Sequence, residues 1–210
     1  MPARRLRDHV VFWYVLLGAW LTAMVVGGGY TWRDKLTPAA ISADVPEQWP
    51  AGTTIPRADG LATLVMLVHP RCPCSRASVA ELSRLMTDTH GRVDAHVLVV
   101  RPIDASEQWE RTDLWDRAAA IPGVTVHTDI GGQEARLFGA IASGHVVVHD
   151  ANGRLLFRGG ITGARGHEGD NPGRSQASAA ILRGLGRAVG PTFGCELLSA
   201  EELVRTSDAR

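Results

Sequence analysis

Two cysteines on either side of a single proline are the residues of this sequence best suited to chemistry. Cys72 and Cys74 lie in the segment 69–76, HPRCPCSR, where an apolar run ends and a helix-patterned stretch begins. A helix N-terminus carries partial positive charge and free N–H donors, so a thiol placed there ionises more readily. Arg71 and Arg76 add positive charge on both sides of the pair. We therefore expect a thiol at this turn to have a pKa below that of a free cysteine and to act as a nucleophile.

Thiol–disulfide exchange is the first chemistry that this pair indicates. The Cys72 thiolate would attack a partner disulfide and form a mixed disulfide, which a second thiol then resolves. Cys74 is the first-choice resolving thiol, and Pro73 would stiffen the small ring that it closes, making the bond strained and oxidising. Cys195 is the alternative resolving thiol if the C-terminal tail folds back over the site. It could instead be a purely structural residue, buried as a small hydrophobic side chain. The competing interpretation of Cys72 and Cys74 is that they are ordinary buried thiols without a redox role.

Metal binding is a second hypothesis from the same residues. Cys72 and Cys74 would supply soft sulfur ligands, and His69, His145 or His167 would supply nitrogen, a set that suits copper or zinc. A Cys-x-Cys pair alone is a weak metal signature, so we commit to no metal or other cofactor. A redox-inert binding module is a third hypothesis, and the retained cysteine pair argues against it.

The composition of the chain narrows the range of partners. Its 210 residues fit one domain with an appendage. The 22 basic residues equal the 22 acidic ones, which argues against a nucleic-acid partner, because such a partner needs a basic excess. Three cysteines are too few for a disulfide-built fold, and an odd number cannot be fully paired within one chain.

The N-terminal region predicts a membrane anchor. Residues 10–30 carry no charge and, as a helix, would span about 31 Å, enough for a bilayer core. The arginines in residues 1–9 favour a cytoplasmic N-terminus. The alternative is a signal peptide cleaved near Gly27–Gly29, but the apolar stretch is long for one. Either interpretation places the remaining chain outside the cytoplasm, and residues 31–60, which are rich in proline, predict a semi-rigid linker.

Residues 61–198 have the pattern of an α/β domain, followed by a tail at 199–210. The nearly continuous apolar run at 61–68 predicts a strand buried on both faces. The further elements expected are a helix at 75–89, a strand at 93–100, a helix at 107–120, a strand at 124–128, a helix at 133–141, a hairpin of strands at 145–149 and 155–158 around Asn152-Gly153, a loop at 159–173, and a helix at 175–189. This order predicts a central mixed sheet flanked by helices, with a parallel core and a terminal antiparallel pair.

The element order and the position of the cysteines resemble the thioredoxin fold. The resemblance is to the membrane-anchored bacterial thioredoxin-like proteins, and among them to the RedB-type group. The motifs that carry it are the strand at 61–68, HPRCPCS at 69–75, SGHVVVHDANG at 143–153, GGIT at 159–162, GHEGDN at 166–171 and FGC at 193–195. This resemblance implies a thiol:disulfide oxidoreductase with a protein thiol or disulfide as partner. It also implies a single-pass anchor in the bacterial inner membrane and a C-terminal domain in the periplasm.

The sequence departs from the usual thioredoxin site at the cysteines. The family pattern is Cys-x-x-Cys, with the first thiol exposed and the second more buried. The helix register places Cys72 in the exposed position and Ser75 in the buried one, so that Cys74 falls between them as an extra thiol.

A second departure concerns the proline that usually faces the thiols. Its place falls near Gly144-His145, so we expect His145 to face the thiols instead, or else to be a strand-end histidine in solvent. We expect Gly144 to help shape the site. We expect His69 to pack beneath the site. Pro70, Arg71, Pro73 and Ser75 are also expected to shape it.

Overall fold

The computed structural model describes residues 2–39, 45–184, 186 and 188–197. The chain divides into two compact units, one ending at Thr37 and the other beginning at Pro38. The expected tail at 199–210 lies outside the described residues.

The first unit is a single long helix, α1 (Pro2–Leu36). Its part Val11–Leu36, with a mean hydropathy of 1.8, is long and apolar enough to cross a membrane. Those 26 residues extend about 39 Å as a helix, more than the roughly 30 Å of a hydrocarbon core. The helix therefore continues past residue 30, where the sequence pattern placed its end, and takes in the first six residues of the expected linker.

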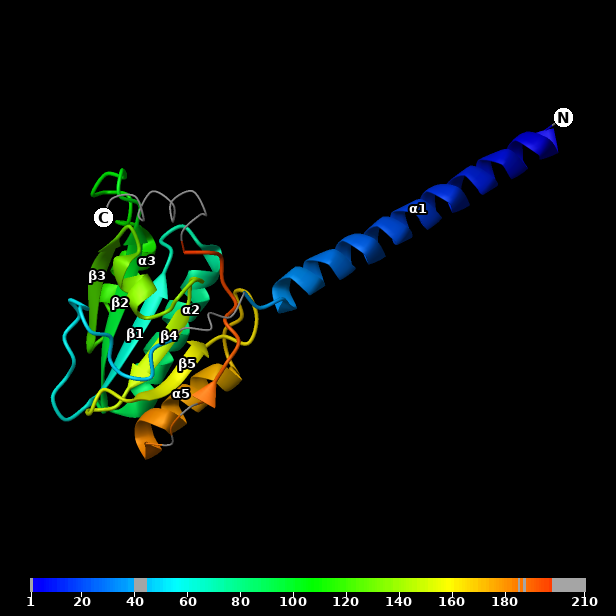
Figure 1. Ribbon diagram of the computed structural model, residues 1–210. Coiled ribbons are helices and arrows are strands. Elements are labelled where there is room, and N and C mark those ends of the chain that lie inside the picture. The colour runs from blue at the N-terminus through cyan, green and yellow to red at the C-terminus, as the bar shows by residue number, and fades with distance from the viewer. Residues whose placement is uncertain (1, 40–44, 185, 187, 198–210) are drawn as a thin grey trace. The chain divides into compact units, whose positions relative to one another are not determined.

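The second unit is built on one mixed sheet in the order β3-β2-β1-β4-β5-β6 (Figure 1). The strands are β1 (Ala62–Val68), β2 (Val93–Arg101), β3 (Val124–Ile130), β4 (His145–His149), β5 (Leu155–Gly160) and β6 (Ala188–Val189). Strands β1, β2 and β3 are parallel, whereas β4 is antiparallel to both β1 and β5. This is a thioredoxin-like fold, as the element order predicted.

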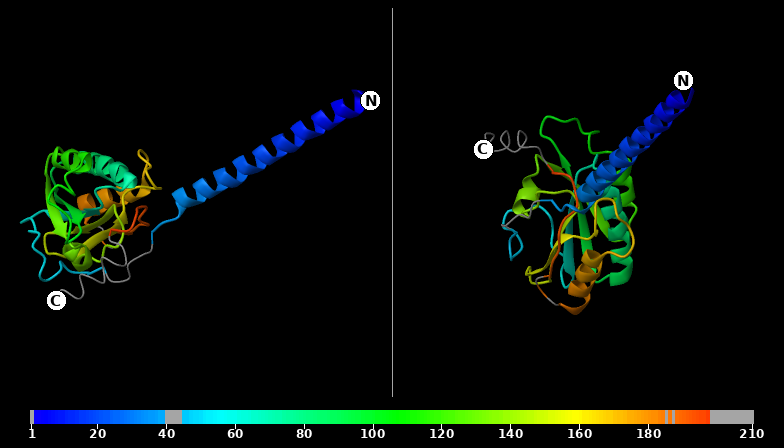
Figure 2. Two further views of the ribbon diagram at one scale, coloured as in Figure 1. Left: turned by 90° about the horizontal axis from the view of Figure 1, so that it is seen from above. Right: turned by 90° about the vertical axis from the view of Figure 1, so that its right-hand side faces the viewer.

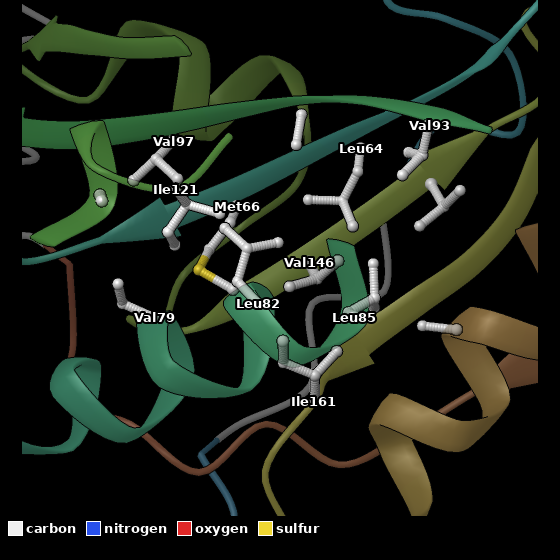
Figure 3. Close-up of a cluster of buried hydrophobic side chains, with 14 of the residues drawn as sticks. Leu64, Met66, Val79, Leu82, Leu85, Val93, Val97, Ile121, Val146 and Ile161 are labelled. Atoms are coloured by element: carbon white, nitrogen blue, oxygen red, sulfur yellow. The ribbon is translucent and has the colours of Figure 1, made fainter. Parts of the chain in front are cut away.

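One face of the sheet is covered by helices α2 (Pro73–Thr89), α3 (Asp113–Ala119) and α5 (Pro172–Arg183). Apolar side chains of α2, including Val79, Leu82 and Leu85, pack against Leu64 and Met66 of β1 (Figure 3). Every residue of β1 after the first is buried. A strand buried on both faces needs an apolar run without alternation, and this is why the sequence pattern identified β1 correctly.

The opposite face is covered by α4 (Gln133–Leu137) and by part of the expected linker (Figure 2). Val45 and Ile55 are buried there, and the Trp49 ring lies 5.2 Å from that of Phe138. The hydroxyl of Thr54 donates a hydrogen bond of 2.7 Å to Glu134. Residues 45–55 are therefore a cover of the sheet rather than a free spacer.

Three helices differ by more than two residues from their predicted extents. The helix expected at 133–141 is α4, which ends at Leu137. The helix expected at 107–120 forms only at 113–119, because Glu110 is buried and binds Arg101 of β2 and Thr128 of β3. These contacts hold the preceding segment in turns against the sheet.

The helix expected at 175–189 is α5, which begins three residues earlier and ends at Arg183. Pro172 suits its first turn, and Gly184, with a φ of 64°, ends it in the left-handed conformation. Ala188 and Val189 form strand β6 beside β5 instead of continuing the helix.

Candidate active site

Cys72 lies between β1 and α2, as the sequence predicts, at the N-cap of the helix. Its backbone N–H donates to the His69 carbonyl at 3.1 Å, and its carbonyl accepts from the Ser75 N–H at 3.1 Å. Pro73 begins the helix, where a missing N–H costs nothing. The expectation that Cys72 is exposed is wrong, because the residue retains only 4% of its accessible surface.

The cover over Cys72 is the C-terminal strap, which we define as residues 188–197. The strap follows the edge of β5 and then returns to the N-terminal end of α2 (red-orange in Figure 1). The Ser143 N–H donates to the Cys195 carbonyl at 2.8 Å, and the Leu197 N–H donates to Ile141 at 3.0 Å. The Sγ atoms of Cys72 and Cys195 lie 3.0 Å apart, and the structure has Cys72, Cys74 and Cys195 as free cysteines. The tail thus folds back over the site, which is the condition that the sequence analysis set for Cys195 to act there.

The three thiols do not ionise alike. Burial alone would raise the pKa of Cys72, but hydrogen bonds from the Cys195 thiol and N–H, the Ser75 hydroxyl and the Cys74 N–H outweigh it and lower that pKa. Burial and the nearby Cys72 thiolate raise the pKa of Cys195 to about 12. Burial and Cys72 also raise the pKa of Cys74. Cys72 is therefore the thiol that ionises first, with two protonated thiols beside it.

A buried pair of serines supports the turn from inside. The Ser75 and Ser143 hydroxyls lie 2.6 Å apart, and the His69 N–H donates to the Ser143 oxygen at 2.8 Å. Each serine is 1% exposed, so Ser75 lies in the buried position that the helix register gives it. Ser143 was missed by the sequence analysis as a separate contributor, since a serine before a strand carries no pattern of its own.

His145 does not lie in solvent. It is 8% exposed, and its Nδ1 lies 3.2 Å from the Thr192 hydroxyl of the strap. Burial, and secondarily the charge of Arg158, lowers the pKa of His145 to about 4, so the ring is neutral at physiological pH. The solvent-facing interpretation is therefore wrong, and the contact with Thr192 joins His145 to the strap that carries Cys195.

Gly144 has a φ of +83° and donates its N–H to the Leu67 carbonyl at 2.7 Å. A Cβ atom at this position would lie 2.6 Å from the Ser78 hydroxyl of α2. The site therefore needs a glycine here both for its backbone conformation and for the close approach of the helix.

The loop between β2 and α3 lies beside the turn. The Trp109 ring lies 5.2 Å from that of His69, and the Arg71 guanidinium lies over Trp109 at 5.0 Å. The Thr112 hydroxyl donates to the Pro70 carbonyl at 3.3 Å. His69 therefore packs against the loop, and the positive charge of Arg71 is held against an aromatic face.

Arg165 is a residue of this site that the sequence analysis missed. Its Nη1 donates to the Gly194 carbonyl at 2.9 Å, one residue before Cys195. Its positive charge acts on both Cys74 and Cys195 and opposes the rise of their pKa values. Arg165 lies in the glycine-rich loop in which we had singled out His167, and the GHEGDN motif gave no reason to choose the arginine just before it.

The described residues offer no three-ligand set for the copper or zinc alternative. Within 2–39, 45–184, 186 and 188–197, no three side chains of His, Cys, Asp and Glu are arranged to hold a metal ion. His167 is exposed. Its backbone N–H donates a hydrogen bond to the Ala164 carbonyl, and its backbone carbonyl accepts one from the Asn171 side chain.

Gly194 makes the closest backbone approach in the strap, and it provides a test of the strap's position. A Cβ atom at Gly194 would lie 1.8 Å from the Ser143 carbonyl oxygen, so Gly194→Ala must displace the strap. We expect formation of the Cys72–Cys195 disulfide to slow by about tenfold to a hundredfold, because small misplacements of reacting groups cost rates of that order. The measurement is the rate of thiol loss during oxidation of the full chain. Gly186→Ala is the matched control, because a Cβ there meets nothing closer than 3.8 Å, and an equal slowing in both variants would contradict the prediction.

No protein-family model matches the chain, and no curated protein matches it. Among solved structures, a hypothetical protein of Sinorhizobium meliloti 1021 is similar to it, with a TM-score of 0.61 and 21% identity over 77% of this chain and 100% of the other. An uncharacterized conserved protein of Geobacillus kaustophilus has a TM-score of 0.60 and 19% identity over 78% of this chain and 97% of the other. At these identities the likeness establishes a shared fold, which each of the two proteins has over nearly its whole length.

Proposed function

We propose that this chain is a membrane-anchored thiol:disulfide oxidoreductase whose redox pair is Cys72 and Cys195. The observation that carries the proposal is the 3.0 Å distance between their Sγ atoms, across 123 residues of sequence. Helix α1 is the anchor, the thioredoxin-like unit lies in the periplasm, and the partner is a protein thiol or disulfide. The RedB-type assignment belongs to the same proposal.

The chemistry is a two-electron exchange between a dithiol and a disulfide. In the reduced form Cys72 is the thiolate and Cys195 holds a proton. Oxidation joins the two sulfurs, releases that proton, and passes two electrons to a partner disulfide, which becomes a dithiol by taking up that proton and a second one from water. The reverse reaction oxidises a partner dithiol. We propose Cys195 in place of Cys74 as the partner of Cys72, because the strap brings the Cys195 sulfur against the thiolate and hydrogen bonds it there.

The lowering of the pKa of Cys72 also bears on the direction of the exchange. A couple whose reduced form is stabilised has a disulfide that accepts electrons readily. Hydrogen bonds from Cys195, Ser75 and Cys74 stabilise the Cys72 thiolate, and only the reduced form contains it. We therefore assign the protein to the oxidising side of thiol exchange.

The proposal is tested by equilibrating the full chain, solubilised in detergent, in glutathione buffers of stepped redox ratio. We expect two of the three thiols to disappear together in one reversible transition, with the third remaining reactive toward maleimide. Cys195→Ser should lose this transition, and Cys74→Ser should keep it. Thiols that never pair at any ratio, or that only acquire glutathione, would overturn the proposal.

The pH dependence of the reduction potential gives a second check. Below the pKa of Cys72 the reduced form binds two protons, so the potential should fall by about 60 mV per pH unit, because one tenfold change per proton is worth about 30 mV for two electrons. Above that pKa only Cys195 binds a proton, and the slope should halve to about 30 mV. Because the pKa of Cys72 is lowered, the change of slope should lie at a pH below 9.0, the ordinary pKa of a cysteine. The pKa of Cys195, at about 12, lies above the pH range of the measurement. A slope that stays at about 60 mV up to pH 9 would contradict the assignment of the thiolate.

A further inference from the structure

The two sulfurs of the proposed redox pair differ sharply in how a partner can reach them. Cys72 is 4% exposed and lies beneath the strap, whereas Cys195 is an exposed residue on the outside of it. Thiol–disulfide exchange requires the attacking thiolate to approach one sulfur in line with the bond that breaks. Resting on the proposed function, we infer that a partner thiolate attacks the protein's disulfide at Cys195, the sulfur of the strap, and that Cys72 is the leaving group.

The surroundings of Cys72 block the other approach. Its backbone is tied to His69 and Ser75 at the N-cap of α2, and the Ser75 hydroxyl hydrogen bonds its sulfur. Ser75 is 1% exposed and joined to the buried Ser143, so the neighbourhood of Cys72 away from the strap is filled by protein. A partner bearing a polypeptide on its thiol has no path to this sulfur while the strap is docked.

The surroundings of Cys195 favour attack there. The Arg165 guanidinium is bonded to the Gly194 carbonyl at 2.9 Å, and its charge acts on the Cys195 and Cys74 thiols. A cation beside an exposed sulfur attracts an incoming thiolate. The hydrogen bonds to Cys72 from the Cys195 N–H, the Ser75 hydroxyl and the Cys74 N–H do not need a free Cys195 thiol, and they make Cys72 the better leaving group of the two.

The exchange then runs in two balanced steps. A partner thiolate attacks Cys195, its S–S bond to Cys72 breaks, and a mixed disulfide between partner and Cys195 forms while Cys72 departs as a thiolate. A second thiolate of the same partner attacks the partner's sulfur in that mixed disulfide and releases Cys195, which takes up a proton. The partner dithiol has been oxidised to a disulfide, and the protein's disulfide has been reduced by the same two electrons. The substrate class is therefore a reduced polypeptide with two thiols.

This order of events is the reverse of the usual thioredoxin-like site, in which the thiol at the helix N-terminus receives the partner. Here the strap moves the point of attack to a cysteine 123 residues later in the chain. The helix cysteine, Cys72, is the other half of the disulfide and leaves as a thiolate.

The position of the first adduct tests the inference. The oxidised full chain in detergent, first shown to contain the Cys72–Cys195 bond, is mixed briefly with reduced glutathione, quenched in acid, and alkylated with N-ethylmaleimide. Fragmentation of the digested peptides then locates each label. The earliest singly reduced species should carry glutathione on Cys195 and maleimide on Cys72, in at least about tenfold excess over the reverse arrangement. The same experiment on Cys74→Ser excludes transfer of glutathione through the third thiol and should give the same pattern.

The outcomes separate this inference from the proposed function. Glutathione on Cys72 with maleimide on Cys195, or equal amounts of both species, would overturn the inference and leave the redox pair intact. If the Cys72–Cys195 bond does not form under oxidation, the proposed function fails, and the inference fails with it.

Discussion

Replacing Cys72 with serine is expected to lower the rate of thiol–disulfide exchange by at least about a hundredfold, because the variant cannot form the Cys72–Cys195 disulfide that oxidises the partner. Cys195→Ser should cost a similar factor, since Cys72 then has no sulfur at 3.0 Å with which to close a disulfide. Cys74→Ser should stay within about threefold of the unchanged protein. The measurement is the rate at which the oxidised full chain oxidises a reduced dithiol peptide.

The ranking of the three variants distinguishes the two possible redox pairs. A Cys-Pro-Cys mechanism requires Cys74→Ser to be as damaging as Cys72→Ser and Cys195→Ser to be harmless. That result would return the redox pair to the two cysteines of the helix turn. It would make the contact between Cys72 and the strap a structural one only.

Glu81→Gln is expected to lower the free energy of unfolding by about 3 kcal/mol, because it removes the charge from a buried ion-pair network. Glu81 of α2 is fully buried, and its carboxylate accepts hydrogen bonds of 2.8 Å from the Gly169 N–H and from Arg174 of α5. Arg84 forms a third contact with it. The variant leaves these donors facing an amide, and denaturant unfolding of the full chain in detergent measures the loss.

The pH dependence of this effect has a definite sign. Burial alone would raise the pKa of Glu81, but hydrogen bonds from Gly169 and Asn171 and the charge of Arg84 hold it below its ordinary value of 4.5. A lowered pKa stabilises the fold fully above the unfolded-state value, and this contribution is lost as the pH falls through the folded-state value. The difference between the unchanged protein and Glu81→Gln should therefore be constant near neutral pH and shrink in acid.

Glu168→Gln is the matched control for Glu81→Gln. Glu168 also pairs with Arg84, but at 3.6 Å and with half of its side chain exposed. An exposed ion pair contributes between zero and about 1 kcal/mol, so this variant should be nearly neutral. Equal losses from the two variants would contradict the role given to the buried network.

The Glu81 network also reaches the candidate site. Gly169 and Arg165 belong to the same loop, and Asn171 holds that loop by accepting from the Gly163 N–H at 2.5 Å. Arg165 in turn holds the Gly194 carbonyl of the strap. Helix α2 therefore carries Cys72 at its N-terminus and also anchors, through Glu81, the loop that contacts the strap beside Cys195.

Local patterns in the sequence were sufficient for strands β1 to β5 of the sheet and for half of the site, whereas β6 was expected to be helical. The apolar run at 61–68 identified β1, and Asn152-Gly153 identified the hairpin of β4 and β5, whose antiparallel pairing confirms it. Cys72 was placed at the strand-to-helix turn because strand and helix periods meet there. In each case the signal lies within a few residues of the feature.

The remaining features depend on contacts between distant parts of the chain. The strap has no periodic pattern, and it is held by backbone hydrogen bonds to Arg158, Gly160 and Ser143, which leave no trace in side-chain composition. The burial of Cys72 follows from that strap and so could not be read from the helix register. The helix expected at 107–120 was shortened for a similar reason, since the partners of Glu110 lie on β2 and β3.

The central claim is that Cys72 and Cys195 form the redox pair, and disulfide mapping of the oxidised full chain tests it most directly. Cleavage after arginine leaves Cys72 and Cys74 together in the peptide 72–76 and Cys195 in the peptide 188–205, so a cross-linked pair of peptides reports the strap disulfide. Fragmentation of that pair, and the same digest of Cys74→Ser, assign the bond to Cys72. The account predicts a Cys72–Cys195 bond that a dithiol reduces and that reforms on oxidation. A bond confined to the peptide 72–76, with a free thiol at Cys195, would contradict it.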